Sequence, residues 1–515
     1  MTRRSDFMRC NPLEKTHRFR CAAVLAAALC ATACQRARMY EEPEGPTPVV
    51  GCDVFASASA APGGAGTRDA PYARLQEAID DAKGGTVCAC AGHPFAEAVT
   101  LPAGIEVRGD FTCNGEWKQS SDAKSTIAGP AGQVALTLTG DADGAKVHGF
   151  VISAANATEP GGSSIAVAVA DIAAELSHLE VRAGDGMPGA DGEPEATAAD
   201  AGEDAPAEGE HAPTNACVVP ARGGESGRMT CGDVVTDGGP GGTGETSPLS
   251  VSLPSTPAEP GEGGKPLAST PPDGYGGTVD ASGTRQAGIA GATGASGTPG
   301  EGGQDGRLTL AGITDGDGAP GQPGKPGQGG GGGAGARVLG VVCTFIDGRP
   351  ADGAAPGGGG GGAGGCGGKG GAGGRAGGSS LGIVSIGTKL SLADVTVTVG
   401  HGGHGGTGAA GQSGGEGGRG APGGTNRNDT NAPDNGAGGK GGRGGDGGPG
   451  GGGRGGHAIG IAYDAAPAAV PSLKEFIPGE PGEGGPGGLE SSSNAGRAGV
   501  SAACWSFKTG TRCAP

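Results

Sequence analysis

Large aromatic side chains are almost missing from this chain of 515 residues, because Phe, Trp and Tyr together make up only 3% of it. Such side chains provide much of the buried apolar area that offsets the conformational entropy lost on folding. Their scarcity argues against an ordinary packed core along most of the length. The chain has instead 120 Gly and 38 Pro, an amount typical of low-complexity or repeat proteins. Any hydrophobic core must therefore be local.

Positive charge and metal-ligand clusters are also scarce. The net charge is −18, which argues against nucleic acid as a partner, because phosphate backbones are bound through clustered Lys and Arg. The Cys and His residues do not form the two closely spaced pairs that build a tetrahedral zinc site. We therefore predict no metal, no cofactor and no nucleic-acid partner.

The apolar run near the N-terminus is too short to span a bilayer. It extends from Cys21 to Ala33, thirteen residues, which fits the core of a signal peptide. We therefore predict a signal peptide over residues 1–33 and no transmembrane helix.

This run ends in a motif that resembles a lipobox, the site at which bacterial lipoproteins are cleaved and lipidated. The motif is Ala31-Thr32-Ala33-Cys34, with Ala31 where Leu is usual. The resemblance implies a lipid attached to Cys34, and Gln35 in place of the inner-membrane retention Asp implies the outer membrane or cell surface. Plain cleavage at the Ala-x-Ala site, which would give a secreted protein, is the alternative.

Ten cysteines remain after Cys34, and this even number suits an oxidising, extracytoplasmic compartment. Short sequence separations suggest three disulfides, adjacent β coils suggest a fourth, and elimination leaves a fifth, although sequence alone cannot fix the connectivity. The suggested pairs are Cys217–Cys231, Cys343–Cys366, Cys504–Cys513, Cys90–Cys113 and Cys52–Cys88.

Residues 72–82 carry apolar side chains at helical spacing, and every later apolar segment is short and β-like. Short strands separated by turn residues need neighbours on which to stack. We predict a mainly β fold in which a short helix caps the rungs of a right-handed parallel β-helix. A β-sandwich is the alternative.

An internal repeat favours stacked coils. The apolar spacing of Val147, Phe150 and Ile152 returns 29 residues later and again after a further 216 residues, and a looser third copy starts at Gly455. Long glycine-rich blocks would then be insertions between rungs, although separate small β units would give the same pattern. The predicted organisation is a linker (34–70), an N-terminal β-helix segment (71–186), an acidic Pro- and Gly-rich insertion (187–335), a glycine tract with a second β segment (336–402), a glycine-triplet tract (403–454) and a C-terminal β segment and tail (455–515).

Within the insertions, glycine recurs at every third position, for example from Gly359 to Gly377 and from Gly438 to Gly456. This period matches an extended helix with three residues per turn. Three structures are compatible with it: a collagen triple helix, a bundle of antiparallel extended glycine helices from one chain (polyglycine II-like), and flexible disorder. Residues 187–280, which are acidic and Pro-rich without the strict period, are expected to be disordered.

Several segments resemble fragments of calcium or metal sites. Gly441–Asp446, Asp141–Gly144 and Asp315–Gly318 start like calcium-binding loops but lack the ligands that should follow, so we expect turns. His401 and His404 make an incomplete metal site and are expected to be exposed.

No pattern in the sequence predicts catalytic residues. The acidic residues near strands, Glu97, Glu106, Asp171 and Glu180, are interpreted as single charges on a solvated face, whereas polysaccharide-cleaving β-helix enzymes need grouped carboxylates or a carboxylate with a basic partner.

Several blocks in a fixed order carry a resemblance to known proteins: Tyr72–Ala82 with Val87–Gly92, Gly109–Cys113 with Trp117, Gly162–Ile165, Ala183–Gly186 and Gly364–Gly370. They resemble uncharacterised glycine-rich secreted proteins of myxobacteria that have a lipoprotein-type signal and a pectin-lyase-like start. The chain is also similar in texture to the mycobacterial glycine-rich repeat (PGRS-type) proteins. The resemblance implies no enzymatic role. We therefore expect a non-enzymatic cell-surface structural or adhesive protein. A polysaccharide-binding or polysaccharide-cleaving β-helix protein is the alternative. Extracellular polysaccharide or other surface proteins are possible partners.

Overall fold

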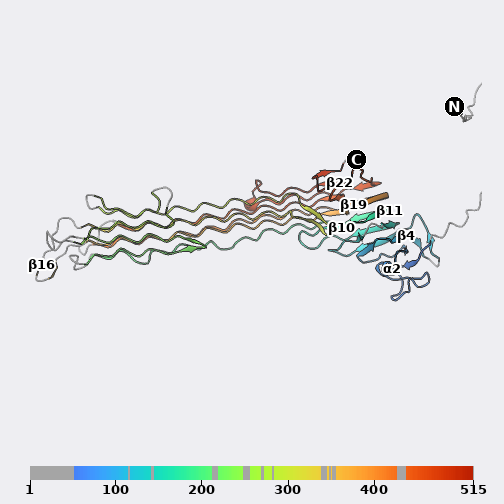
Figure 1. Cartoon of the computed structure of the whole chain (residues 1–515), viewed down its shortest axis with the longest axis horizontal. Coiled ribbons are helices and arrows are strands. Elements are labelled where there is room, and N and C mark those ends of the chain that lie inside the picture. The colour runs from blue at the N-terminus through green and yellow to red at the C-terminus, as the bar shows by residue number, and fades with distance from the viewer. Residues whose placement is uncertain are drawn as a thin grey trace, which may run out of the picture. The chain divides into compact units, whose positions relative to one another are not determined.

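The computed structural model describes residues 51–113, 116–140, 144–211, 219–246, 256–267, 272–280, 284–337, 355–425 and 436–513, and the backbone of two further short strands, β16 (Phe345–Ile346) and β17 (Arg349–Pro350). Met1–Gly51 and Cys52–Pro515 are separate units. The predicted signal peptide, Cys34 and the first part of the linker lie outside the described residues. The second unit is mainly β, as predicted, and consists of two curled parallel sheets with glycine-rich segments that leave them side by side (Figure 1).

Sheet A is built from strands that pair in parallel with the corresponding strand of the next pass of the chain. Its order is β1 (Val54–Ala56), β2 (Thr86–Cys90), β4 (Glu106–Thr112), β8 (Ala145–His148), β11 (Ala173–Ala183), β19 (Lys389–Val399) and β21 (Glu475–Ile477). Three strands extend it: β5 (Lys118–Gln119) is antiparallel to β4, and β6 (Ser125–Gly129) pairs with β9 (Phe150–Ala154), which pairs with β11.

Sheet B is formed by the alternate strands of the same passes. Its order is β3 (Val99–Pro102), β7 (Leu136–Thr139), β10 (Ser164–Ala170), β18 (Ser380–Ile386), β20 (Ala458–Tyr463) and β22 (Ser501–Ser506), followed by the antiparallel β23 (Thr511–Arg512).

The register of these strands confirms the sequence repeat. Leu176 of β11 lies beside Val147 of β8, an offset of 29, and beside Leu392 of β19, an offset of 216. The looser third copy is also found, because Leu381 pairs with Ile459 at an offset of 78, whereas Val397 pairs with Phe476 at 79. The chain thus resumes its stack after each glycine-rich block. Parallel pairing of this kind argues against the β-sandwich alternative, whose sheets are antiparallel.

The hydrophobic core lies between the two sheets. The helix α2 (Leu75–Ala82) contributes its buried side chains Leu75, Ala78 and Ile79. A second cluster lies on the other face of sheet B, where Leu308 of a hairpin packs against β10, β18 and β20. This hairpin consists of β14 (Arg307–Thr309) and β15 (Gly312–Thr314). Because both faces of sheet B are covered, its central strands are apolar at successive positions rather than alternating.

The glycine-rich segments form an ordered bundle, which we call the glycine bundle and define as the described parts of 187–306, 316–336, 357–378, 400–424, 436–456 and 479–499. Its backbones are joined by hydrogen bonds at every third residue. Neighbours run antiparallel, as in the bonds from the amides of residues 318, 321, 324, 327, 330 and 333 to the carbonyls of 374, 371, 368, 365, 362 and 359. Others run parallel, as in the bonds from residues 288, 291, 294, 297, 300 and 303 to 437, 440, 443, 446, 449 and 452.

Glycine is required because the neighbouring backbones are so close. A Cβ placed on Gly361 would lie 2.0 Å from the carbonyl oxygen of Gly330, and one on Gly447 would lie 1.8 Å from that of Lys369. An extended helix with three residues per turn directs successive residues to three faces. Each face that lies against another segment needs glycine, so a triplet contains more glycines where more of its faces are in contact. Residues 357–365 are buried on all faces and are almost all glycine, whereas Lys369, Ala372 and Arg375 occupy the one exposed face of residues 366–377.

Two of the alternatives for the glycine triplets are therefore wrong. The bundle is made by a single chain whose segments have both antiparallel and parallel neighbours. It therefore matches the polyglycine II-like alternative except for the purely antiparallel order, and it is not a collagen triple helix of three chains. The described part of residues 187–280 is ordered, contrary to the prediction of disorder. For example, the amides of Gly189, Gly192 and Gly202 donate to residues 404, 407 and 416. An outer segment needs only one small-residue face, so acidic residues and Pro on its other faces do not prevent its docking.

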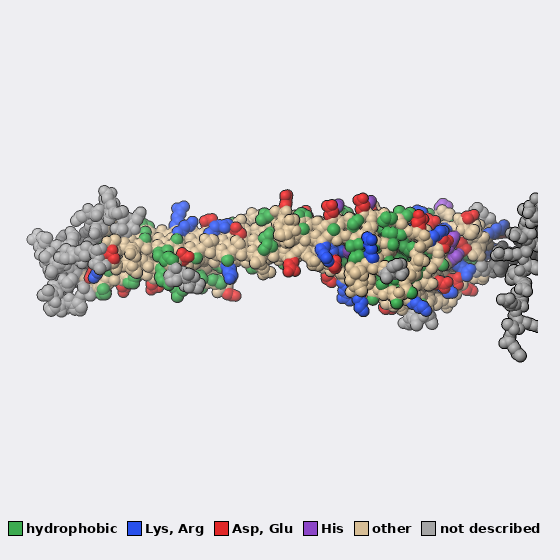
Figure 2. Space-filling model, turned by 90° about the horizontal axis from the view of Figure 1, so that it is seen from above, with side chains coloured by type: hydrophobic (Ala, Val, Ile, Leu, Met, Phe, Trp, Pro, Cys, Tyr) green, Lys and Arg blue, Asp and Glu red, His purple; other side chains and the backbone are tan. Residues whose placement is uncertain are grey.

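Short elements interrupt the bundle: the hairpin of β12 (Thr230–Cys231) and β13 (Val234–Val235), and one 3₁₀ turn, η1 (Gly488–Glu490). The face of the bundle visible in Figure 2 is mainly backbone and small residues with scattered charged side chains. Among the described residues, no helix has the length and apolar character needed to cross a membrane.

Candidate functional site: disulfides, acidic acceptors and a charged row

Four disulfides tie the described residues together. Three match the suggested pairs: Cys52–Cys88, Cys90–Cys113 and Cys504–Cys513. The fourth joins Cys231 to Cys366 across 135 residues, so the suggested pairs Cys217–Cys231 and Cys343–Cys366 are wrong. Cys217 and Cys343 themselves lie outside the described residues.

The wrong pairs followed from short sequence separation, which does not set proximity in this bundle. Instead, the segment after Cys231 docks beside residues 361–366. The Thr236 hydroxyl donates to the Gly364 carbonyl at 2.9 Å, and the Gly364 amide donates to the Thr236 carbonyl at 2.8 Å. Four disulfides are compatible with an extracytoplasmic protein.

Acidic side chains of the calcium-like motifs accept backbone amides. Asp446 accepts from Gly414 N at 2.8 Å and from Arg443 at 2.7 Å. The hydrogen bond from Arg443, and then the one from the Gly414 amide, lower the pKa of Asp446. Asp317 accepts from Ala376 N at 2.8 Å, while Asp315 has a left-handed backbone with φ of 65°, as a turn requires. Residues 141–143 lie outside the described residues.

The same use of carboxylates recurs along one outer segment of the glycine bundle and directly before it. Asp185, Asp191 and Asp204 accept the amides of residues 401, 407 and 419 at 2.6–2.7 Å. These amides belong to positions between glycines, where a neighbouring carbonyl is not the acceptor. The acidic residues of the insertion therefore satisfy the bundle's outer backbone donors.

His401 and His404 are exposed, as expected, and each has a partner. Their Nδ1 atoms accept the amides of Glu480 and Glu483, both at 3.2 Å. Across the described ranges, no three His, Cys, Asp or Glu side chains are grouped in a way that could hold a metal ion.

A row of titratable side chains crosses sheet A, and the sequence did not predict it. It comprises Asp110, His148, His178, Asp394 and Lys474, contributed by successive passes of the chain. His148 Nε2 lies 3.6 Å from Asp110, and the two imidazoles stack with centroids 5.7 Å apart. Asp394 then accepts from His178 Nδ1 at 2.7 Å and from Lys474 Nζ at 2.6 Å.

Both ring nitrogens of His178 lie against hydrogen-bond acceptors. Nδ1 faces the Asp394 carboxylate, and Nε2 lies 2.9 Å from the carbonyl oxygen of Ser121. The imidazole is therefore held from two sides, by the carboxylate of the next pass and by a backbone carbonyl.

An unusual backbone conformation positions this part of the row. Gly149, His178 and Asp394 occupy the same place on three successive passes, with φ of 73°, 54° and 55°. Left-handed backbone costs a residue with a Cβ about 1–2 kcal/mol. The contact between His178 and Asp394 therefore sits on backbone that glycine would adopt more readily, a feature often found at functional positions.

Charges in the row are tuned by their neighbours. Burial acts to raise the pKa of Asp110, but hydrogen bonds from His148 and Gln119 prevail and lower it. Lys474, followed by His178, lowers the pKa of Asp394, while Asp394 raises that of Lys474.

The interpretation of the strand carboxylates as single solvated charges is wrong for three of them. Glu180 pairs with Lys124 at 3.0 Å and Arg182 at 2.7 Å, and these bonds lower its pKa. Glu106 pairs with Arg108 at 2.6 Å. Glu97 is only 9% exposed and accepts the amide of Leu75 at 2.7 Å, at the start of α2. Asp171 is exposed.

A cavity of about 290 Å³ lies beside the charged row and is lined by Lys124, Glu180, Arg182, Asp394, Thr396 and Lys474, among others. It thus offers both donors and acceptors to a polar ligand. The only sequence signal for it was the offset of 216, which places His178 and Asp394 at equivalent positions.

Asp394→Asn should remove part of the acid sensitivity of folding. The pKa of Asp394 is lowered in the folded protein, so its stabilising effect is present above the unfolded value of about 3.9 and is lost as pH falls through the folded value. We expect Asp394→Asn to unfold more easily at pH 7 and to lose less stability than the wild type below pH 4. Urea titrations at pH 3 to 7 measure this difference.

Asp171→Asn is the matched control, because Asp171 has the same left-handed backbone with φ of 54° and no side-chain partner among the described residues. An equal effect of the two substitutions would show that the ion pair is not the cause.

Comparisons with known proteins give no family for this chain: no protein-family model matches it, and no curated protein is similar to it.

Proposed function

We propose that this chain is a non-enzymatic structural and adhesive protein of the bacterial cell surface, exported through residues 1–33 and anchored by a lipid on Cys34. Its coils would form a right-handed parallel β-helix, with α2 covering the first coil. The glycine bundle would act as a stiff spacer that projects from it. If Cys34 is not lipidated, the same protein would be secreted.

The observation that supports this proposal best is the hydrogen-bond pattern of the glycine bundle. A segment such as 357–377 bonds to the segments that contain residues 190–210, 224–227, 236–242, 318–333, 403–424 and 436–454. Backbone bonded on all sides cannot bend freely, so the bundle supplies length and stiffness without a hydrophobic core. Extracellular proteins of this kind also benefit from disulfides, because no cellular reductant breaks them there.

Cys34→Ala should abolish lipid attachment. Cells that express the full chain and are fed radiolabelled palmitate should label the wild type and not the variant, and the variant should leave the membrane fraction. Cys30→Ala, in the same apolar run, is the control and should be labelled normally. Equal labelling of wild type and Cys34→Ala would contradict the anchor, and unlabelled wild type that is still exported would favour the secreted form.

A polysaccharide-binding or polysaccharide-cleaving protein is the second candidate, and the charged row favours it. The row and its cavity provide carboxylates with basic partners on one sheet face, the arrangement that glycan chemistry needs. Release of new reducing ends from plant or bacterial polysaccharides, lost in Asp394→Asn, would support this candidate over the first.

A further inference from the structure

A second polar cavity, of about 680 Å³, lies at the first coils and is distinct from the charged row. Its volume falls within the range of about 300–1,000 Å³ that is usual for small-molecule sites. Three chain segments line it: the loop of residues 57–71, the turn of residues 90–93 and the strand end around Cys113 and Trp117. We call it the Trp117 pocket.

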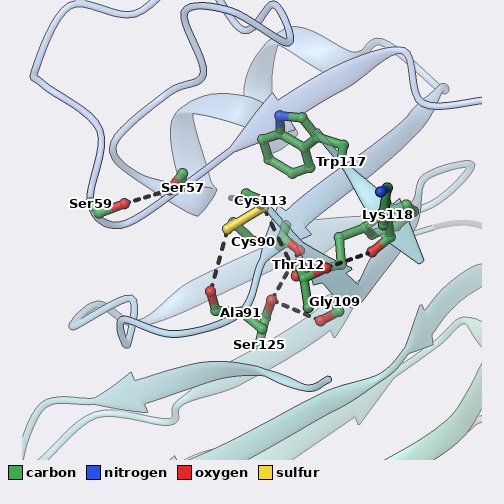
Figure 3. Close-up of a disulfide and its surroundings, with 12 residues drawn as sticks. Ser57, Ser59, Cys90, Ala91, Gly109, Thr112, Cys113, Trp117, Lys118 and Ser125 are labelled. Atoms are coloured by element: carbon green, nitrogen blue, oxygen red, sulfur yellow. Dashed lines mark hydrogen bonds between the residues drawn. A yellow bond between two sulfur atoms is a disulfide. The ribbon is translucent and has the colours of Figure 1, made fainter. Parts of the chain in front are cut away.

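The Trp117 pocket is held in shape by covalent and reciprocal contacts. The Cys90–Cys113 disulfide joins two of its segments, and the indole of Trp117 lies over this disulfide, with Ser57 and Ser59 across from it (Figure 3). Trp117 Nε1 donates to the carbonyl of Arg68 at 3.2 Å, and the Arg68 guanidinium donates back to the Trp117 carbonyl at 3.4 Å. The loop is therefore tied to the indole before any ligand binds, which reduces the entropy lost on binding.

The indole presents an apolar wall with its own polar atom already satisfied. The ring of Phe55 meets the indole edge-on, with the ring centroids 4.8 Å apart, and the centroid of the Phe111 ring lies 6.3 Å from that of the indole. These contacts fix the plane of the ring. A ligand that packs on the indole within the pocket gains apolar contact and needs no hydrogen bond from it.

The rest of the lining can both donate and accept hydrogen bonds. Asp69 and His93 line the pocket, and within the described part of the chain neither side chain has a hydrogen-bond or ion-pair partner. Ser57 and Ser59 bond to each other at 3.0 Å and keep further capacity. The charges of Arg68 and Asp69 are opposite, so the pocket has no strong preference for an ionic ligand.

We propose that the Trp117 pocket binds a neutral sugar unit of a polysaccharide, with the apolar face of the sugar against the indole. Sugar hydroxyls donate and accept, which matches the carboxylate of Asp69, the guanidinium of Arg68 and the imidazole of His93. This inference rests on the adhesive part of the proposed function and gives it a ligand class. It does not depend on the glycine bundle.

Fluorescence of the full chain tests the proposal directly. The chain has two Trp residues, so Trp505→Phe leaves Trp117 as the only indole. This variant is titrated with neutral oligosaccharides of glucose, mannose, galactose and N-acetylglucosamine, and with a galacturonate oligomer as the charged probe. We expect at least one neutral probe to change the Trp117 emission saturably, and Asp69→Ala to weaken that binding at least tenfold. Asp122→Ala, at an exposed site outside the pocket lining, should leave it unchanged.

Three results would overturn the proposal: no response to any neutral probe, a response to galacturonate alone, or equal binding by Asp69→Ala. Amide hydrogen exchange of residues 357–378 is measured on the same samples. If sugar binding is absent while the bundle amides are protected from exchange, only the pocket proposal is contradicted. If the amides are unprotected while sugar binding is retained, only the spacer proposal is contradicted.

Discussion

Gly361→Ala should destabilise the glycine bundle by about 3 kcal/mol or more. Gly361 donates to Gly239 at 2.8 Å, and a Cβ there would lie 2.0 Å from the carbonyl oxygen of Gly330 and 2.9 Å from that of Gly331. Both obstacles are backbone atoms of one neighbouring segment, 316–336, which is itself bonded to further segments. Relief would have to move this segment away from its other partners as well, so the loss should spread beyond the substituted triplet.

Gly263→Ala is the matched control, because the same substitution should have the opposite sign there. A Cβ on Gly263 meets only ordinary contacts, 3.4 Å to Leu267 and 3.5 Å to Gly274. Replacing glycine where its backbone suits alanine stabilises a protein by about 0.4–1 kcal/mol, because the unfolded chain loses freedom.

Hydrogen exchange and calorimetry of the full chain measure both effects. We expect Gly361→Ala to lose amide protection over residues 357–378 and to lower the melting temperature, and Gly263→Ala to do neither. Protection that persists in Gly361→Ala would contradict the close packing of the bundle.

The glycine period allowed the three-fold helix to be predicted, but not whether it is ordered. Order depends on partners tens to hundreds of residues away, such as the pairing of 318–333 with 359–374. A glycine triplet carries no information on which neighbour it will meet. The same limit explains Cys231–Cys366: each thiol sits on a different segment, and only the bundle brings them together.

The coil repeat was predictable because apolar side chains at fixed offsets must stack in register. Val147, Leu176 and Leu392 show this. The charged row could not be predicted, because Asp110, His148 and Lys474 acquire their partners only when the coils stack. The Trp117 pocket was missed for the same reason. Its walls come from three segments: the turn at 90–93 and the strand end with Trp117 stood out in the sequence, but the loop of residues 57–71 did not.

The junction between sheet B and the glycine bundle contains a buried Arg454–His457 contact that should make folding sensitive to mild acid. His457 is 2% exposed, and Arg454 is fully buried. His457 Nδ1 accepts the amide of Val500 at 2.8 Å, and its other nitrogen contacts the Arg454 guanidinium. Burial, and then the positive charge of Arg454, lower the pKa of His457 to about 3.

This shift should cost the protein stability as pH falls from 6.5. The unfolded histidine has a pKa of about 6.5, so between pH 6.5 and 3 the unfolded chain binds a proton that the folded chain does not. Stability therefore falls with pH in this window, by about 2 kcal/mol between pH 6.5 and 4.5. Carboxylates such as Asp394 and Asp446, whose pKa values are lowered, act only below about pH 4.

Trp505 reports on this junction, because its ring centroid lies 6.3 Å from that of His457. Urea titrations of a Trp117→Phe background, followed by Trp505 emission, should show the slope between pH 4.5 and 6.5. His457→Gln should abolish the slope, and His93→Gln, at an exposed site, should keep it. Arg454→Met should reduce it only in part, because burial remains while the neighbouring charge is gone. A slope that survives in His457→Gln would mean that another group binds the proton, and the buried imidazole would then not link the bundle to pH.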